Sequence, residues 1–116
     1  MITETNTRIV EPGITVFSIS GRLHLGNLLV SVETYLHRLI AEGTRKIVID
    51  LTNLTYADSA ATGMLIGVNG LMEQAGGKLR MAGAAGSVAR SFDVVHMNRI
   101  VPLDADVDGA CKALSD

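Results

Sequence analysis

The sequence predicts a single α/β domain in which a mixed β-sheet of four to five strands is packed with about four α-helices. Short apolar segments of strand length alternate with longer segments whose apolar residues recur every three or four positions, and this alternation is typical of α/β folds. The length of 116 residues suits one domain, and a hydrophobic fraction of 47% supplies one core. We therefore expect one domain over residues 1–116.

Two strands are expected first, over Arg8–Val10 and Ile14–Ser20, because both segments are apolar and β-branched. The intervening Glu-Pro-Gly has turn chemistry, and Gly21 is expected to end the second strand. A helix is then expected over Leu25–Glu42, with Gly43 at its C′ position. Its helical spacing is carried by Leu25, Leu28, Leu29, Val32, Leu36, Leu39 and Ile40.

The second half of the chain continues the alternation. Lys46–Leu51 is an apolar run that suits a strand covered on both faces, and a loop over 52–58 follows it. The remaining expected elements are a helix over Ser59–Ala75, a strand over Lys78–Ala82, a helix over Gly86–Met97 with Val88, Phe92 and Val95 in phase, a short strand over Arg99–Pro102 and a helix over Asp104–Leu114. We expect Met64, Met72, Met81 and Cys111 to fill the core.

Composition excludes several classes of function. Ten basic and 12 acidic residues give a net charge of −2, which argues against a direct nucleic-acid surface. One cysteine forms no intramolecular disulfide and no Cys-rich zinc site, and His37 and His96 have no metal-ligand spacing to other candidates. No apolar run approaches the ~20 residues of a membrane helix, and the N-terminal segment lacks the apolar region of a signal peptide. We expect a cytoplasmic protein with no metal, no cofactor and no membrane contact.

The junction of loop and helix at 56–63 carries the most chemistry. Asp58 is a candidate N-cap, because its carboxylate can accept a hydrogen bond from the backbone N–H of Ala60 or Ala61. Ser59 would then be the first helical residue, with its hydroxyl directed into solvent or into a crevice at the end of the sheet. Helix N-termini favour negative charge, so a covalent phosphate is tolerated at this position.

Three glycines of the following helix, Gly63, Gly67 and Gly70, lie on one stripe. Each costs about 0.8–1.0 kcal/mol relative to alanine, so a compensating gain is expected. Close approach of this stripe to the sheet or to a neighbouring helix is the favoured explanation. A docking surface for a partner is the alternative.

The segment KIVIDLTNLTYADSAATGMLIG resembles the core of the STAS domain, a family named for sulphate transporters and anti-sigma-factor antagonists. The shared pattern is an apolar strand, Asp-Leu, a loop and Asp-Ser at the head of a helix. Gly21-Arg22-Leu23 resembles an early G-x-L element, the Gly-Gly-Lys turn at 76–78 fits the family, and so does the spacing of Val88 and Phe92. The resemblance covers essentially the whole chain and implies the STAS fold.

The resemblance implies an anti-sigma-factor antagonist, also called an anti-anti-sigma factor. In the family the residue after the motif aspartate is the phosphoacceptor, which here is Ser59. An unphosphorylated antagonist docks on an anti-sigma factor that is also a GHKL-type serine kinase and so frees the sigma factor for transcription. Phosphorylation releases the antagonist, and a PP2C-type phosphatase resets it. We expect a monomer or weak homodimer.

Two positions depart from the family pattern. His24 stands where antagonists commonly carry aspartate, and the motif reads D-S-A-A-T-G instead of D-S-S-G-L-G. Similar loosened motifs occur in stressosome-type scaffold subunits and in accessory subunits of ABC lipid transporters, which are the alternative functions. An enzyme is not expected, because no histidine converges on Ser59 and the Gly-Gly-Lys turn lacks the P-loop frame.

The partner-binding surface is expected to surround Ser59. It draws on the loop before the first long helix, the start of the second helix and the turn before the third. The expected residues are His24, Leu25, Gly26, Asn27, Asp58, Ser59, Ala60, Thr62, Gly63, Gly86 and Ser87. Thr62 is expected to face solvent or the partner.

Overall fold

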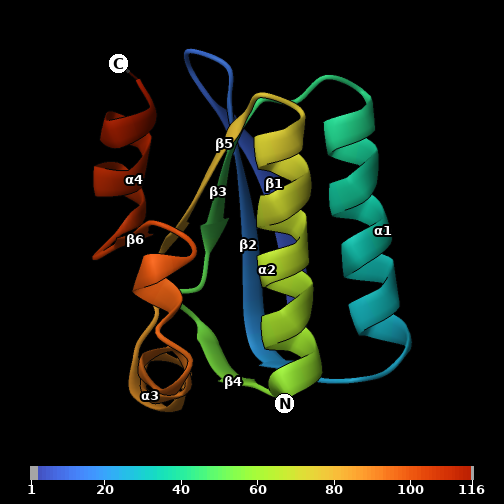
Figure 1. The fold of residues 1–116 in the computed structure, drawn as a ribbon, viewed down its shortest axis with the longest axis vertical. Helices are drawn as coiled ribbons and strands as arrows, with labels where there is room; N and C mark the ends of the chain where they lie inside the picture. Colours follow the sequence, from blue (N-terminus) through green and yellow to red (C-terminus); the bar gives the residue numbers. More distant parts are fainter. Residues whose placement is uncertain (1–2, 116) are drawn as a thin grey trace.

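The computed structural model describes residues 3–115, so Met1, Ile2 and Asp116 of the expected domain lie outside the described residues. Strands and helices alternate along most of the chain, as Figure 1 shows. In order they are β1 (Glu4–Val10), β2 (Ile14–Leu23), α1 (Asn27–Ala41), β3 (Lys46–Asp50), β4 (Leu54–Ala57), α2 (Ser59–Gln74), β5 (Lys78–Ala82), α3 (Gly86–Val94), a 3-10 turn (Met97–Arg99), β6 (Leu103–Asp104) and α4 (Val107–Leu114).

The sheet is mixed and has six strands. Its order is β1-β2-β3-β5-β6, and β4 pairs with β2 beyond this path. β1 and β2 form an antiparallel hairpin, while every other pairing is parallel. The predicted fold class is therefore confirmed, with one strand, β4, more than the sequence analysis anticipated.

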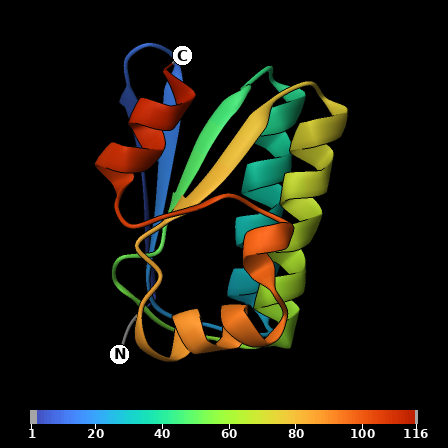
Figure 2. The ribbon, with the colours of Figure 1, turned by 60° about the vertical axis from the view of Figure 1, so that its left-hand side comes forward.

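Helices cover the two faces of the sheet unequally. α1 and α2 lie side by side on one face, and α4 covers part of the other (Figures 1 and 2). β2 serves both layers: Phe17 and Ile19 belong to the large core under α1 and α2, whereas Ile14 and Val16 belong to the small core under α4. This division follows from the two-residue period of a strand, which sends alternate side chains to opposite faces.

Both cores contain residues that were expected in the interior. Met64, Met72 and Met81 are buried in the large core, and Cys111 of α4 is buried in the small core, as expected. Within residues 3–115, no helix has the length and apolar character needed to cross a bilayer.

The expectation that Gly21 ends the second strand is wrong. β2 continues to Leu23, because its backbone changes partner at Gly21 from β3 to β4, with a shift of register between Gly21 and Arg22. Gly21 adopts a φ of 89°, a conformation that glycine favours, and its N–H donates to the carbonyl of Asn53 at 2.9 Å. The segment over 52–58 is therefore not all loop, because it contains β4.

The expected helix over Gly86–Met97 is too long. α3 ends at Val94, since His96 adopts a left-handed φ of 54° and the chain then forms the 3-10 turn that buries Met97. The short strand is also displaced: it lies at Leu103–Asp104 and not at Arg99–Pro102.

The last helix begins at Val107, three residues after the expected Asp104. Asp104 instead pairs with Ala82 in the sheet, and its carboxylate accepts a hydrogen bond from Arg80 Nε at 2.7 Å. Asp106 is the N-cap, and it accepts a hydrogen bond from the N–H of Gly109 at 2.8 Å.

We predict that Gly77→Ala lowers the free energy of unfolding by roughly 1–3 kcal/mol, because the new methyl group overpacks its site. A Cβ at Gly77 would lie 2.8 Å from the carbonyl oxygen of Arg45, whereas a Cβ at Gly67 would meet nothing within 4 Å. Gly67→Ala is the matched control and should stabilise the protein by about 0.5–1 kcal/mol. Urea denaturation measures both. Equal effects of the two substitutions would contradict the packing assigned to Gly77.

Candidate functional site

Asp58 joins three segments of the chain. Its Oδ1 accepts a hydrogen bond from the N–H of Ala61 at 2.8 Å, which caps α2 as the sequence predicted. Its Oδ2 accepts a second hydrogen bond from the N–H of Leu25, also at 2.8 Å, and its own N–H donates to the carbonyl of Leu23 at 3.2 Å. The end of β2, the loop before α1 and the start of α2 are therefore tied to one residue.

The environment of Asp58 favours the charged carboxylate. Its pKa lies below the ordinary value of 3.8, chiefly because of the hydrogen bond from Leu25 and next because of that from Ala61. Partial desolvation opposes this shift, while the positive charge that His24 can carry adds to it. A negative charge therefore stands beside Ser59 at neutral pH.

Ser59 is the first residue of α2, and its side chain is exposed, as expected. The next two residues turn inward: Ala60 packs against the large core, and Ala61 is fully buried. The hydroxyl at the start of the helix is therefore open to another macromolecule, while the turn that carries it is anchored in the core.

The expectation that Thr62 faces solvent is wrong, whereas the alternative, that it faces a partner, stays open, because Thr62 lines the groove described below. Thr62 is only 7% exposed, and its Oγ1 donates a hydrogen bond to the carbonyl oxygen of Asp58 at 3.0 Å. It lies four residues after the N-cap, where the helix returns to its core-facing side. The hydroxyl of Thr62 thus serves the first turn of α2 and is not open for modification.

A groove of about 390 Å³ begins at Ser59 and lies between α2 and α3. Asp58, Ser59, Thr62 and Ser91 are its polar lining residues. Its apolar part includes Ile66 and two valines that are unusually open to solvent: Val94 is 80% exposed and Val95 is 42% exposed. The phosphoacceptor candidate therefore lies in the same groove as exposed apolar side chains.

Five lining residues of this groove were not identified from the sequence as part of the binding surface: Ala57, Ile66, Ser91, Val94 and Val95. Val95 was expected to share the apolar phase of Val88 and Phe92, and this is wrong, because it follows the end of α3. The sequence shows an adjacent pair of valines, but only the structure shows that α3 ends at Val94 and that the left-handed His96 follows Val95.

The glycine stripe does not approach the sheet or another helix. At Gly63, Gly67 and Gly70, a Cβ would find no neighbouring atom within 4 Å. The favoured packing explanation is therefore wrong, and the stripe lies on the outer side of α2. Gly63 lines the groove, which leaves the docking explanation in place.

The other two expected segments differ in their relation to Ser59. His24, Leu25, Gly26 and Asn27 are exposed, and the hydrogen bond from Leu25 holds their loop against Asp58. Gly86 and Ser87 begin α3, and the Ser87 hydroxyl donates to the carbonyl of Thr55 at 2.8 Å. Neither the loop over 24–27 nor the pair Gly86 and Ser87 lines the groove. α3 crosses the lower end of the sheet, and its C-terminal end lies near the start of α2 (Figure 2).

The described part of the chain, residues 3–115, contains no group of three or more His, Cys, Asp and Glu side chains arranged to hold a metal ion. The polar atoms around Ser59 are instead committed to the backbone, as the two oxygens of Asp58 illustrate. The arrangement presents a hydroxyl beside an apolar surface.

Comparison with known proteins gives a consistent result. The sequence profile described as the STAS domain matches residues 7–110. The fold is similar to that of a Thermotoga maritima protein assigned as an anti-sigma factor antagonist, with a TM-score of 0.89 and 17% identity over 97% of this chain and 95% of that one. An anti-sigma factor antagonist from Mycobacterium paratuberculosis matches with a TM-score of 0.85 and 19% identity over 99% and 96% of the two chains. The phosphorylated form of the Bacillus cell fate determinant SpoIIAA matches with a TM-score of 0.76 and 16% identity over 95% and 98%.

We predict that Asp58→Ala lowers the free energy of unfolding by roughly 2–3 kcal/mol at pH 7, because it removes two charge-assisted hydrogen bonds. Asp106→Ala is the matched control; among residues 3–115 the Asp106 side chain makes one cap bond, so its loss should cost about 1 kcal/mol.

The stabilisation by Asp58 should depend on pH with a defined sign. Its pKa is lower in the folded chain than in the unfolded chain, so the stabilisation is complete above the unfolded value and is lost as the pH falls through the folded value, below 3.8. Chemical denaturation of wild type and Asp58→Ala from neutral to acid pH measures it. A difference in stability that stays constant down to the lowest pH would contradict the assignment.

Proposed function

The chain belongs to the STAS domain family, and from this membership we propose that it is an anti-sigma-factor antagonist that acts by partner switching. It docks on an anti-sigma factor that is also a GHKL-type serine kinase, and phosphorylation of Ser59 releases it. A PP2C-type phosphatase then restores the docking-competent form. The observation that carries the proposal is an exposed serine hydroxyl at a helix N-terminus, in one groove with exposed apolar side chains.

The likeness to solved antagonists supports this proposal at the level of the fold. Two of the similar structures are antagonists or assigned as such, and a third is a phosphorylated form of SpoIIAA. Phosphorylation is thus compatible with a fold of this kind.

The energetic basis of release is the burial of charge. A phosphate on Ser59 adds about −1.5 to −2 charges. A partner that covers Ser59 together with the apolar groove excludes water from this phosphate, and burying an uncompensated dianion costs several kcal/mol. Since about 1.4 kcal/mol corresponds to a tenfold change in affinity, one phosphate is sufficient to release the partner.

Release by phosphorylation requires no change in fold, because Asp58 holds the backbone around Ser59 in place. Both of its carboxylate oxygens accept hydrogen bonds from backbone N–H groups, so the loop and the helix start stay joined when Ser59 is modified. The charge of Asp58 adds to that of the phosphate at the surface that a partner would cover. The phosphorylated and unphosphorylated forms therefore differ in surface charge more than in backbone structure.

Burial of the apolar groove provides the binding affinity for the anti-sigma factor, and the phosphate on Ser59 lowers this affinity. Val94 and Val95 expose apolar surface next to Ile66, and burial of such surface contributes roughly 25 cal/mol per Å². Gly63 widens the groove close to Ser59, because no side chain fills the space above it. We assign this groove, with the loop over 24–27, as the docking surface for the anti-sigma factor.

The test of the switch is incubation with candidate anti-sigma kinases, taken from the gene neighbourhood, and ATP. Mass mapping should place one phosphate on Ser59, and the phosphorylated protein should bind the kinase at least about tenfold more weakly than the unmodified protein. Ser59→Ala should accept no phosphate and remain bound. Ser31→Ala removes an exposed serine that does not line this groove and should behave as wild type. Equal binding of both forms, or a phosphate on another residue, would reject the proposed switch.

The role of the groove is tested by Gly63→Leu. The new side chain fills the groove and should weaken kinase binding at least about tenfold, while the gain in helix propensity raises the free energy of unfolding by roughly 0.5–1 kcal/mol. Gly70→Leu on the same helix is the control; Gly70 does not line the groove, so stability should rise with no loss of binding. Loss of binding in both variants, or in neither, would exclude the groove as the docking surface.

A further inference from the structure

β1 forms an open edge of the sheet. It pairs with β2 on one side, and all of its residues except Val10 are exposed. Its register with β2 runs through seven consecutive pairs without a bulge. A long, regular and exposed edge strand has backbone N–H and C=O groups on its outer side that are available to another strand. The edge is therefore a potential interface.

The sequence of β1 is self-complementary in charge. Glu4 and Arg8 lie two positions on either side of Asn6, and both side chains are exposed. If two copies of β1 pair antiparallel about Asn6, Glu4 of each copy lies opposite Arg8 of the other. Within residues 3–115 the Arg80–Asp104 pair accounts for every ion pair, so none of these residues competes as an ionic partner of Glu4 or Arg8.

We propose that a second copy of this chain binds to the edge of β1, forming a two-fold symmetric dimer whose sheet continues from one copy into the other. The axis passes between the two Asn6 residues and stands perpendicular to the sheet. Thr5 then lies opposite Thr7, and Glu4 lies opposite Arg8, twice each. In an isologous interface, residue i of the first copy contacts residue j of the second, and residue j of the first copy contacts residue i of the second.

The backbone is compatible with this register. Every pair joins residues that are both even-numbered or both odd-numbered, so outward-pointing N–H groups of one strand meet outward-pointing C=O groups of the other. Glu4, Asn6 and Arg8 share one face of the strand, and Thr5 and Thr7 share the other. Opposite charges placed directly across an antiparallel pair stabilise it, and like charges destabilise it.

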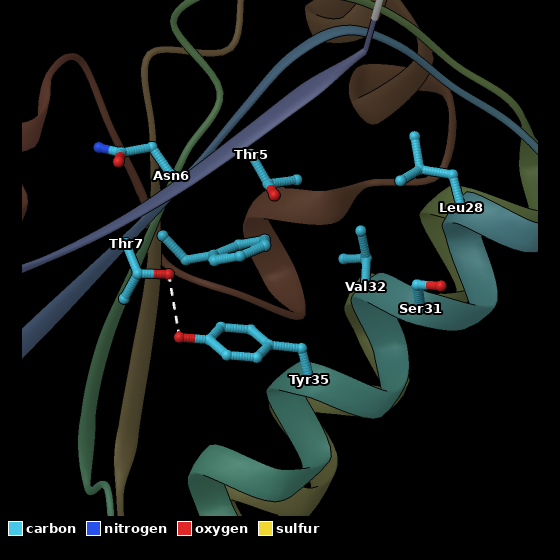
Figure 3. Close-up of a pocket in the computed structure, with 8 residues that line it drawn as sticks. Thr5, Asn6, Thr7, Leu28, Ser31, Val32 and Tyr35 are labelled. Carbon is cyan, nitrogen blue, oxygen red and sulfur yellow. Dashed lines mark hydrogen bonds between the residues drawn. The ribbon is translucent and has the colours of Figure 1, made fainter.

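The helix above β1 leaves room for the second copy. A groove of about 400 Å³ separates β1 from α1, and Figure 3 shows Thr5 and Thr7 on its strand side and Leu28, Ser31 and Val32 on its helix side. Tyr35 bridges the groove, and its hydroxyl donates to Thr7 Oγ1 at 3.0 Å. In the dimer the two grooves lie on the same face of the joined sheet.

The interface is small, since it consists of two seven-residue strands and their immediate neighbours. Stable interfaces usually bury about 1,200–2,000 Å², so this dimer is weak and its population depends on concentration. It is also sensitive to salt, because the two charge pairs are exposed. It uses no residue of the Ser59 groove, so it is independent of the proposed partner switch.

Sedimentation velocity over a range of protein concentrations tests the dimer. Wild type should associate reversibly to a dimer that weakens at high salt. Glu4→Arg and Arg8→Glu should each raise the dimer dissociation constant at least about tenfold, because each places like charges opposite one another twice. Ser59→Ala should dimerise as wild type, which separates this interface from the partner-binding surface.

Charge exchange provides the decisive control. An equimolar mixture of the Glu4→Arg and Arg8→Glu variants should form a heterodimer, because both charge pairs become attractive again, and the double variant Glu4→Arg/Arg8→Glu should self-associate. Circular dichroism verifies folding, and Asn6→Asp, which places two like charges at the axis, serves as a further disruptive variant. A wild type that stays monomeric, a dimer insensitive to these substitutions, or a mixture that does not associate would overturn the proposal.

Discussion

The carboxylate of Asp58 is the constraint on which the site depends. One oxygen caps α2 through Ala61, and the other holds the loop before α1 through Leu25, 33 residues away in sequence. Without these two bonds, neither the orientation of the first turn of α2 nor the approach of the loop over 24–27 would be defined. The exposed hydroxyl of Ser59 has a fixed position because its neighbour uses both oxygens internally.

The fold was predictable where local pattern decides the structure. The helical spacing over α1, the apolar run of β3 and the Asp-Ser start of α2 each reflect interactions within a few residues. β4 was not predictable in this way, because it forms only where β2 changes partner at Gly21. The position of β6 likewise depends on Asp104, which pairs with Ala82 and Arg80 from a distant part of the chain.

The candidate site was predictable to the same extent. Asp58 and Ser59 follow the rules of helix capping, which need only the sequence around them. The packing of the glycines and the solvent exposure of Thr62 were misjudged, because the sequence shows the spacing of a helix but not which side of it meets the sheet. Ile66, Val94 and Val95 come together only through the packing of α3 near the start of α2, so no sequence motif predicts the groove that they line.

The division of the interior into two cores has a consequence for local opening. α4 contributes Ala110, Cys111 and Leu114 to the small core, with Val107 packed against it, and none of these residues belongs to the large core under α1 and α2. Local opening of α4 therefore leaves the packing of the large core in place. Burial raises the pKa of the Cys111 thiol and keeps it unreactive in the closed state. The chain has one cysteine, so its rate of alkylation reports every opening that exposes this helix, whether local or global.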